Sequence, residues 1–290
     1  MTEQPWHADV RAVRRASDKA AAHYTQTAAI TGEIFRRLET RLDYLAIEPK
    51  VVLDLGCGTG SALPVLQKRY KKALLTGLDI SLPMLRQAAP TRLFSRKQAL
   101  VQADAQQLPF ADESVGLIVS NLAFFLCPQT GRLFSEISRV LASGGALLFT
   151  TLGPDTLRTF LDVIEQADPV GARLRFADMH DLGDMMAAAG LAQPVLDIEY
   201  LTVTYSSVES MLGDLRAGGA VNVARGRRRG LMSGQKAAQI RRAIEQSGVR
   251  DFTFEIVQGH AWKSDRSGAP AGRSSVLPER YIPIRVDKPD

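Results

Sequence analysis

The chain has 290 residues, 45% of them apolar and 23% charged, with a net charge of +5. This composition excludes a wholly disordered chain, and the length suits one large α/β domain with additions, or at most two domains. No segment approaches the roughly 18 consecutive apolar residues that span a bilayer, and the N-terminus lacks the apolar stretch of a secretory signal. We therefore expect no membrane partner.

Two cysteines, Cys57 and Cys127, cannot form a disulfide framework and give no metal-binding CxxC pair, so a reducing cytoplasm is the expected compartment. The positive charge and the pI near 9.3 favour an acidic partner or a basic, solvated surface. Because the chain carries no known DNA- or RNA-binding motif, we expect no nucleic acid as partner. The sequence leaves the oligomeric state open.

The N-terminal region has helical periodicity over residues 11–45, with Gly32 as a possible break. An apolar strand over 51–55 and a glycine turn over 56–60 follow it. Strand and helix patterns then alternate, which predicts βαβ units and a mainly parallel sheet. In chain order we predict a helix at 62–71, a strand at 73–80, a helix at 83–89, strands at 99–103 and 117–121, a helix at 132–141 and a strand at 146–151.

Beyond residue 152 the pattern is less regular. We predict helices at 156–166, 179–189 and 208–216, strands at 195–205 and 252–262, and a Gly/Arg-rich loop at 218–230. The fold class that follows is α/β, with a Rossmann-like, seven-stranded, mainly parallel sheet and helices on both faces. The expected parts are an N-terminal helical cap over 1–48, a core over 49–263 with an insertion around 153–230, and a flexible tail over 264–290.

The segment Val51–Gly60 reads VVLDLGCGTG and places Gly56, Gly58 and Gly60 directly after a strand. Glycines there allow a sharp turn and contact with a ligand without Cβ collisions, and the N-terminus of a helix follows. The GxGxG spacing differs from the GxGxxG fingerprint of dinucleotide-binding folds. A tight structural turn would also explain a glycine triplet, so the loop needs a second signal.

Acidic residues at the ends of the next two strands supply that signal. Asp79 lies 19 residues beyond Gly60, where a carboxylate can accept both hydroxyls of a ribose; it could instead cap the helix that begins near Pro83. Asp104 and Ala105 end the third strand, and an apolar segment, Leu108–Phe110, follows. Ligands of open parallel sheets bind at the carboxyl ends of strands, so these positions predict one nucleoside-binding site.

The segments LDLGCGTG, GLDIS, QADAQQLPF and EISRVLASGGALLFTT resemble the class I S-adenosylmethionine-dependent methyltransferases. The resemblance covers Asp54 to Thr151 and implies S-adenosyl-L-methionine as the cofactor. The implied cofactor-binding residues are Asp54, Gly56, Cys57, Gly58, Gly60, Asp79, Ile80, Met84, Asp104, Ala105, Asn121 and Leu122.

Segments outside this core are similar to the biotin-pathway malonyl-acyl carrier protein O-methyltransferases: AAAHYTQTAAI at 20–30, FTTLGPDTL at 149–157, RF at 175–176 and MLGDLRAGGAVN at 211–222. This similarity implies methylation of the free carboxylate of a malonyl group carried on acyl carrier protein, with the 153–230 insertion on the acceptor side. A carboxylate with a pKa of about 4 is already ionised at neutral pH, so no general base is needed.

The same similarity gives the candidate catalytic residues. Tyr24, in the AAHY segment, is expected on the acceptor side, although it could equally be a core tyrosine of the cap. Arg175 and Arg216 are candidates for binding the acceptor carboxylate, because arginine binds carboxylates bidentately; either could be a surface arginine. As a hypothesis, the crowded arginines of the 218–230 loop meet the acidic carrier protein and the phosphate of its arm: Arg225, Arg227, Arg228 and Arg229.

The chain departs from this family where it has Gly116, Leu126–Pro128 and Ser143. It also shares the stretches 181–190 and 212–219 with the complex I assembly factor that resembles an arginine hydroxylase. Three alternatives therefore remain at this stage: this hydroxylase-like class, another small-molecule methyltransferase, and a cofactor-binding module without catalysis.

Overall fold

The computed structural model describes residues 6–27, 29–89, 98–170, 173–217 and 222–264, with the backbone alone for 25–27 and 215–217. Within these ranges seven strands form one sheet in the order β3-β2-β1-β4-β5-β7-β6. β7 is antiparallel to both of its neighbours and the other strands run in one direction, which confirms the predicted fold class. The strands are β1 (Val51–Leu55), β2 (Leu74–Asp79), β3 (Gln98–Gln102), β4 (Val115–Asn121), β5 (Leu141–Leu152), β6 (Leu191–Thr204) and β7 (Asp251–Lys263).

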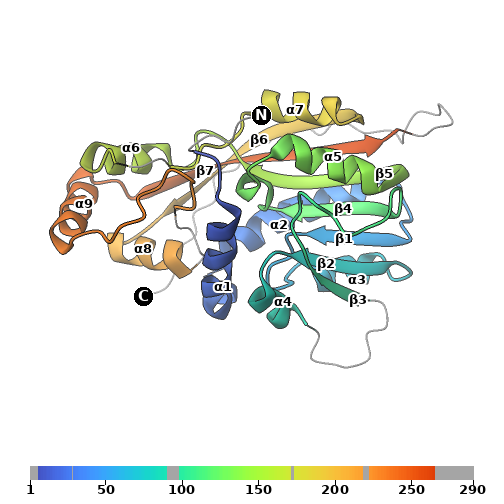
Figure 1. The fold of residues 1–290 in the computed structure, drawn as a ribbon, viewed down its shortest axis with the longest axis horizontal. Coiled ribbons are helices and arrows are strands. Elements are labelled where there is room, and N and C mark those ends of the chain that lie inside the picture. Colours follow the sequence, from blue (N-terminus) through green and yellow to red (C-terminus); the bar gives the residue numbers. More distant parts are fainter. Residues whose placement is uncertain (1–5, 28, 90–97, 171–172, 218–221, 265–290) are drawn as a thin grey trace.

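Helices cover both faces of the sheet (Figure 1). α5 (Thr130–Val140) and α7 (Met179–Ala188) pack on the face that presents Leu53 and Leu147. α2 (Ala29–Arg41) and α3 (Leu63–Arg69) pack on the opposite face, which presents the adjacent Val52 and Leu148. Side chains alternate between the two faces of a strand, so apolar strands such as β1 can serve both cores. α4 (Leu82–Ala88) packs beside β2 and β3.

β6 and β7 extend beyond the other strands and carry a separate lobe (Figure 1). The lobe contains α6 (Arg158–Ala167), α8 (Val208–Ala217) and α9 (Gly234–Ser247), which share a small core that includes Phe160, Met211, Ile244 and Phe252. The sequence analysis did not predict α9, because its apolar stripe is narrow and Ile244 is its one buried residue. Its end signals were present: Ser233 caps the N-terminus, and Gly248 ends the helix with φ of 68°.

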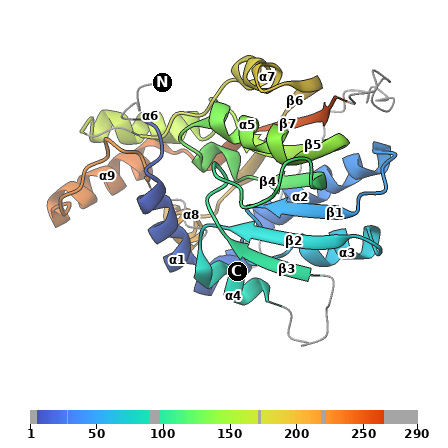
Figure 2. The ribbon, with the colours of Figure 1, turned by 45° about the vertical axis from the view of Figure 1, so that its right-hand side comes forward.

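The N-terminal helices have two different places. α1 (Val10–Thr27) crosses between the sheet and the lobe, whereas α2 packs on the sheet through Phe35 and Leu38 (Figures 1 and 2). The predicted break at Gly32 is wrong, since Gly32 lies inside α2 with no atom near its missing Cβ. A glycine in a helix costs only about 1 kcal/mol, which tertiary packing readily offsets. Of the region 1–48 that the sequence predicts as a cap, α1 lies over the space between sheet and lobe, and α2 packs on the sheet.

α1 is attached at both of its ends. At one end Ser81 Oγ donates to Asp18 Oδ1 at 2.6 Å, and Gln87 Nε2 donates to the carbonyl of Ala21 at 2.5 Å. At the other end Ala8 forms a β-bridge with Ala224, next to the Arg227–Asp9 ion pair described below. The helix thus joins α4, beside the sheet, to the loop that precedes α9.

The tail predicted over 264–290 lies, apart from Ser264, outside the described residues. Among the helices that the structure describes, none has the length and apolarity needed to cross a membrane.

Candidate functional site

A cavity of about 1420 Å³ lies between the carboxyl ends of the central strands and the lobe, beneath α1. Its walls include Gly58 and Asp79 from the sheet, Tyr24 from α1, and Phe160 and Leu212 from the lobe. A pocket for one small ligand usually measures about 300–1,000 Å³. The cavity is therefore large enough for two ligands, one at the sheet and one toward the lobe.

The glycine loop forms the floor of the cavity at the sheet. Gly56 and Gly58 line it with φ of 79° and 53°, in the left-handed region that glycine tolerates. A Cβ on Gly56 would overlap the Cβ of Ala123, so the loop after β1 touches the loop after β4. Gly60 also has a positive φ, but its missing Cβ would lie 2.8 Å from the Cβ of Ala88 in α4, and it does not line the cavity. Gly60 thus serves the packing of the loop.

Asp54 and Cys57 lie behind the lining. Asp54 is 2% exposed, and burial followed by the nearby charge of Asp79 raises its pKa to about 7. Its Oδ2 atom has no hydrogen-bond partner. Burial likewise raises the pKa of the Cys57 thiol, whose Sγ lies 3.0 Å from the position of a Cβ on Gly77. Both side chains support the loop from within, and a direct contact of either with a cofactor stays a prediction.

Asp79 ends β2 and faces the cavity. Its two carboxylate oxygens accept the amides of Ser81 at 2.8 Å and Gly58 at 3.0 Å. Burial raises the pKa of Asp79, although these amides act in the opposite direction. The residue that caps α4 is Ser81, whose Oγ accepts the amide of Met84, so Asp79 is not the helix cap. Ile80 and Met84 line the cavity beside it.

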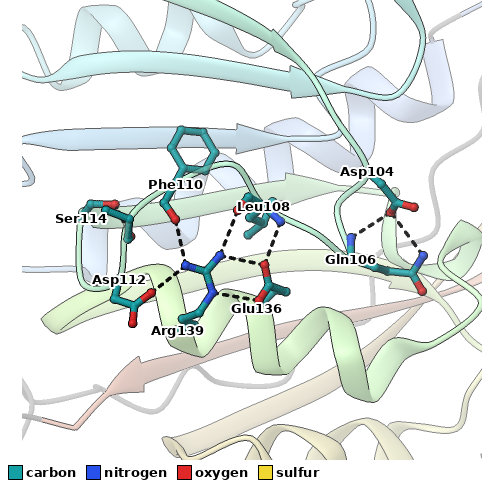
Figure 3. A network of polar contacts seen from close by, with 9 residues as sticks. Asp104, Gln106, Leu108, Phe110, Asp112, Ser114, Glu136 and Arg139 are labelled. Atoms are coloured by element: carbon teal, nitrogen blue, oxygen red, sulfur yellow. Dashed lines mark hydrogen bonds and ion pairs between the residues drawn. The ribbon is translucent and has the colours of Figure 1, made fainter.

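Asp104 and Ala105 line the cavity after β3, in the loop drawn in Figure 3. Asp104 Oδ1 accepts the backbone amide of Gln106 at 2.9 Å and its side-chain amide at 3.2 Å. Gln106 in turn accepts the amide of Gln129 at 2.9 Å. These bonds fix the orientation of the Asp104 carboxylate and the neighbouring backbone.

Two residues of α5 hold the next part of this loop (Figure 3). Arg139 donates to the carbonyls of Leu108 at 2.9 Å and Phe110 at 2.8 Å. Glu136 accepts the amide of Leu108 at 2.8 Å and forms an ion pair with Arg139. The sequence analysis missed this support. A Glu and an Arg three residues apart on a helix was its signal, but nothing local indicates that the pair holds a distant loop.

The end of β4 closes the sheet side of the cavity. Asn121 donates to the carbonyl of Thr31 in α2 at 3.0 Å and accepts from Thr150 Oγ1 at 2.8 Å. Leu122 lines the cavity with φ of 55°, a left-handed conformation that costs a non-glycine residue about 1–2 kcal/mol. Strained residues of this kind cluster at ligand sites.

Tyr24 covers the glycine loop from above. Its ring carbon Cε1 lies 3.8 Å from the position of a Cβ on Gly58, and its neighbours include Met84. Burial and then the charge of Asp79 raise the pKa of its hydroxyl. The ring therefore lies at the sheet end of the cavity, against the glycine loop.

Of the two arginines predicted to bind the acceptor, the structure describes the side chain of Arg175 only. Arg175 is exposed, and its guanidinium lies over the ring of Trp6 at 5.0 Å from the centroid, away from the cavity lining. Arg216 lies in α8, and its side chain is outside the described part of the structure. Arg173, which the sequence analysis did not select, does line the cavity.

Two members of the arginine loop are held in ion pairs. Arg227 pairs with Asp9 at 3.1 Å and Arg228 with Asp168 at 2.8 Å, and both line the cavity. Arg228 and Arg229 are both exposed. The hypothesis is that these arginines form one docking surface for a carrier protein. Arg227 and Arg228 already pair with acids of this chain, so they are less available to such a partner.

Two departures from the family pattern also have a place in the structure. A Cβ on Gly116 would lie 2.9 Å from the Cβ of Pro49, so the bare backbone lets Pro49 pack there. Leu126 and Cys127 both line the cavity, as expected for a departure that bears on the acceptor.

The residues at the sheet end fit a nucleoside joined to an amino acid. Carboxylates lie at the ends of β2 and β3. Gly56 and Gly58 expose bare backbone to the cavity, and Met84 and Leu122 contribute apolar side chains. The described residues contain no group of His, Cys, Asp and Glu side chains that could hold a metal ion. The fold and this site define a class I S-adenosylmethionine-dependent methyltransferase.

Comparison with known proteins agrees and narrows the class. Residues 53–149 match the model of the methyltransferase domain family. The chain is 39% identical to the malonyl-[acyl-carrier protein] O-methyltransferase of Methylovorus sp., over 95% of this chain and 97% of that one. It is 40% identical to the enzyme of the same name from Laribacter hongkongensis, over 91% and 92%. The chain therefore belongs to the malonyl-[acyl-carrier protein] O-methyltransferase family.

Among solved structures, the YcgJ protein of Bacillus subtilis has a TM-score of 0.55 and 18% identity, over 79% of this chain and 99% of that one. This likeness shows the fold alone. Among the alternatives that the sequence left open, the sequence relatives favour an O-methyltransferase over the hydroxylase-like class.

Proposed function

We propose that this enzyme transfers a methyl group from S-adenosylmethionine to the free carboxylate of a malonyl thioester carried on acyl carrier protein. The observation that carries the proposal is the single cavity that joins the sheet end to the lobe, in a chain that aligns over nearly its whole length with relatives named for that reaction. In this proposal the product serves biotin precursor synthesis.

The cofactor, when bound, supplies an electrophilic methyl group on a sulfonium sulfur. Asp79 would accept hydrogen bonds from the ribose hydroxyls, and Asp104 with Ala105 would meet the adenine. Gly56 and Gly58 would lie against the amino-acid end, where no side chain intervenes. Each of these groups is already fixed by backbone hydrogen bonds or tight turns, so little reorganisation accompanies binding.

The protein's task at the acceptor is placement rather than proton transfer. A malonate carboxylate is ionised at neutral pH, so its methylation requires no general base. Tyr24 and Leu122 line the site, and in this proposal they would exclude water, which favours attack by a desolvated carboxylate. Tyr24, Arg175 and Arg216 remain candidates for acceptor contacts.

The test uses purified protein, methyl-labelled S-adenosylmethionine and malonyl-acyl carrier protein, with acetyl-acyl carrier protein as the matched control that lacks a free carboxylate. We expect a labelled methyl ester on the malonyl substrate alone. Cofactor binding in calorimetry without ester formation on the malonyl substrate would exclude the proposal. Rescue of a biotin-requiring strain that lacks its own methyltransferase tests the pathway separately.

A further inference from the structure

One wall of the cavity runs along the length of α6. Leu157, just before the helix, and Phe160, Leu161, Ile164 and Asp168 all line the cavity. These positions are three or four residues apart, so they form one face of the helix. α6 has 10 residues and is therefore about 15 Å long. The cavity continues as a channel from the end of β5 to the far end of α6.

Beside α6 the lining of the channel is mainly apolar, with polar side chains such as Thr204, Ser210 and Asp214 among its lobe residues. Across from α6 it is lined by Val203, Leu212, Ile240 and Phe254. A slender, uncharged ligand segment would be surrounded mainly by apolar side chains along this part of the channel.

Three cations converge at the far end. Asp168 is 4% exposed, and its Oδ1 lies 2.8 Å from Arg228 and 3.8 Å from Lys236. Arg173 donates to the backbone carbonyl of Asp168 at 3.2 Å. A second acid, Glu165, lies 3.9 Å from Arg173, but its side chain is 69% exposed. The cluster therefore has three partly exposed cations for two acids, of which only Asp168 is buried, and both of its arginines line the channel.

We propose that this cluster, Arg173, Arg228 and Lys236 around Asp168, binds the phosphodiester of the pantetheine arm that links the acyl group to its carrier protein. The inference rests on the proposed function. The carboxylate that is methylated must lie near Gly58 and Leu122, at the sheet end. A cationic site one helix length away must then serve a different anion of the same substrate.

The chemistry of the arm matches the channel. The pantetheine part is long and uncharged, and its single anion lies at the end remote from the thioester. Guanidinium groups bind phosphate oxygens bidentately, and Lys236 adds a third positive charge behind Asp168. The same cations also tie the end of α6, since Lys236 donates to the carbonyl of Ala167 at 2.7 Å. The experiment must separate phosphate binding from this structural role.

Three acceptors separate them: malonyl-acyl carrier protein, malonyl-phosphopantetheine and malonyl-pantetheine, which lacks the phosphate. For the unaltered enzyme we expect kcat/KM to be at least roughly tenfold higher for malonyl-phosphopantetheine than for malonyl-pantetheine, as loss of a charge-assisted hydrogen bond implies. Arg173→Gln should remove most of that difference by raising KM for the phosphorylated acceptors while kcat for malonyl-pantetheine stays unchanged.

Arg173 is the residue of choice because its contacts are a carbonyl and an exposed acid, so its loss leaves no buried charge unpaired. Arg228→Lys is the second variant, since it keeps a positive charge beside Asp168 and removes the planar guanidinium group that can bind phosphate bidentately. The matched control is Arg158→Gln at the start of α6, where the side chain is 72% exposed and outside the cavity lining.

An equal fall in activity on both small acceptors would show a structural role and overturn the inference. Equal kcat/KM for the two acceptors in the unaltered enzyme would do the same. If no malonyl thioester is methylated, the proposed function fails, and calorimetry with phosphopantetheine and pantetheine still decides the inference. Tighter binding of phosphopantetheine, lost in Arg173→Gln, would support the site, and equal binding of the two would reject it.

Discussion

The two ends of the cavity are built in different ways. At the sheet end, the carboxylates of Asp79 and Asp104 each accept an amide two residues further along the chain, from Ser81 and from Gln106. At the lobe end, the cation cluster draws on α6, on the segment after it and on the start of α9. We therefore expect substitutions at the strand ends to be poorly tolerated. The residues of the lobe wall, which come from separate segments, can differ between enzymes with different acceptors.

The largest effect is expected at the glycine loop. Gly56→Ala should destabilise the fold by about 3 kcal/mol and abolish cofactor binding, because a left-handed alanine and a forced overlap with Ala123 both oppose it. Urea unfolding measures the first effect and calorimetry with S-adenosylmethionine the second. A variant that binds the cofactor normally would show that the loop is as tolerant as the lobe.

Asp79→Asn should lower the affinity for S-adenosylmethionine about 100-fold, because two hydrogen bonds to a charged carboxylate, each worth about 1.5 kcal/mol, would be weakened. The matched control is Asp162→Asn on α6, an exposed carboxylate of the lobe. Calorimetry should show unchanged affinity for the control. A similar loss of S-adenosylmethionine affinity in both variants would show that the sheet end is no more important for cofactor binding than the lobe.

Asp54 should make stability depend on pH. Its pKa in the folded protein is about 7, above the usual 3.8, so the native state holds the proton more tightly than the unfolded chain. The resulting stability is present in full below pH about 4 and is lost as the pH rises through 7. Between pH 5 and 8 the loss should be about 3 kcal/mol, at about 1.4 kcal/mol for each of the roughly two units between pH 5 and the folded pKa.

Asp54→Asn removes this titration, so its unfolding free energy, measured in urea at pH 5, 6, 7 and 8, should change less than that of the unaltered protein. A constant difference between the two proteins over this range would contradict the protonation of Asp54. Asp54 lies behind the cavity lining, so this measurement reports how the residue supports the loop and does not depend on contact with the cofactor.

The smallest effect is expected in the lobe. Gly213 lies inside α8 with open space around its missing Cβ, so Gly213→Ala should stabilise the protein by about 0.5–1 kcal/mol. Thermal unfolding measures the gain, and methyltransferase activity should be retained. A destabilised variant would show that this helix is packed as tightly as the glycine loop.

Much of the sheet end followed from the sequence. The seven-stranded fold was predicted and is confirmed, and of the twelve predicted cofactor-binding residues Gly56, Gly58, Asp79 and Asp104 line one cavity, as do Ile80, Met84, Ala105, Asn121 and Leu122. Asp54, Cys57 and Gly60 belong to the same motif but lie behind the lining. Spacing along a strand and turn does not say which side of the loop faces the ligand.

The sequence by itself determined the fold class and the cofactor, and it predicted the edge of the sheet for the cofactor site, because parallel strands bring consecutive motifs to one edge. Only the tertiary structure decided that α1 covers the site, that Glu136 and Arg139 hold the Asp104 loop, and that Arg173, not Arg175, lines the cavity. These arrangements depend on contacts between segments far apart in the chain. No local pattern encodes such contacts, because they follow from packing the lobe against the sheet.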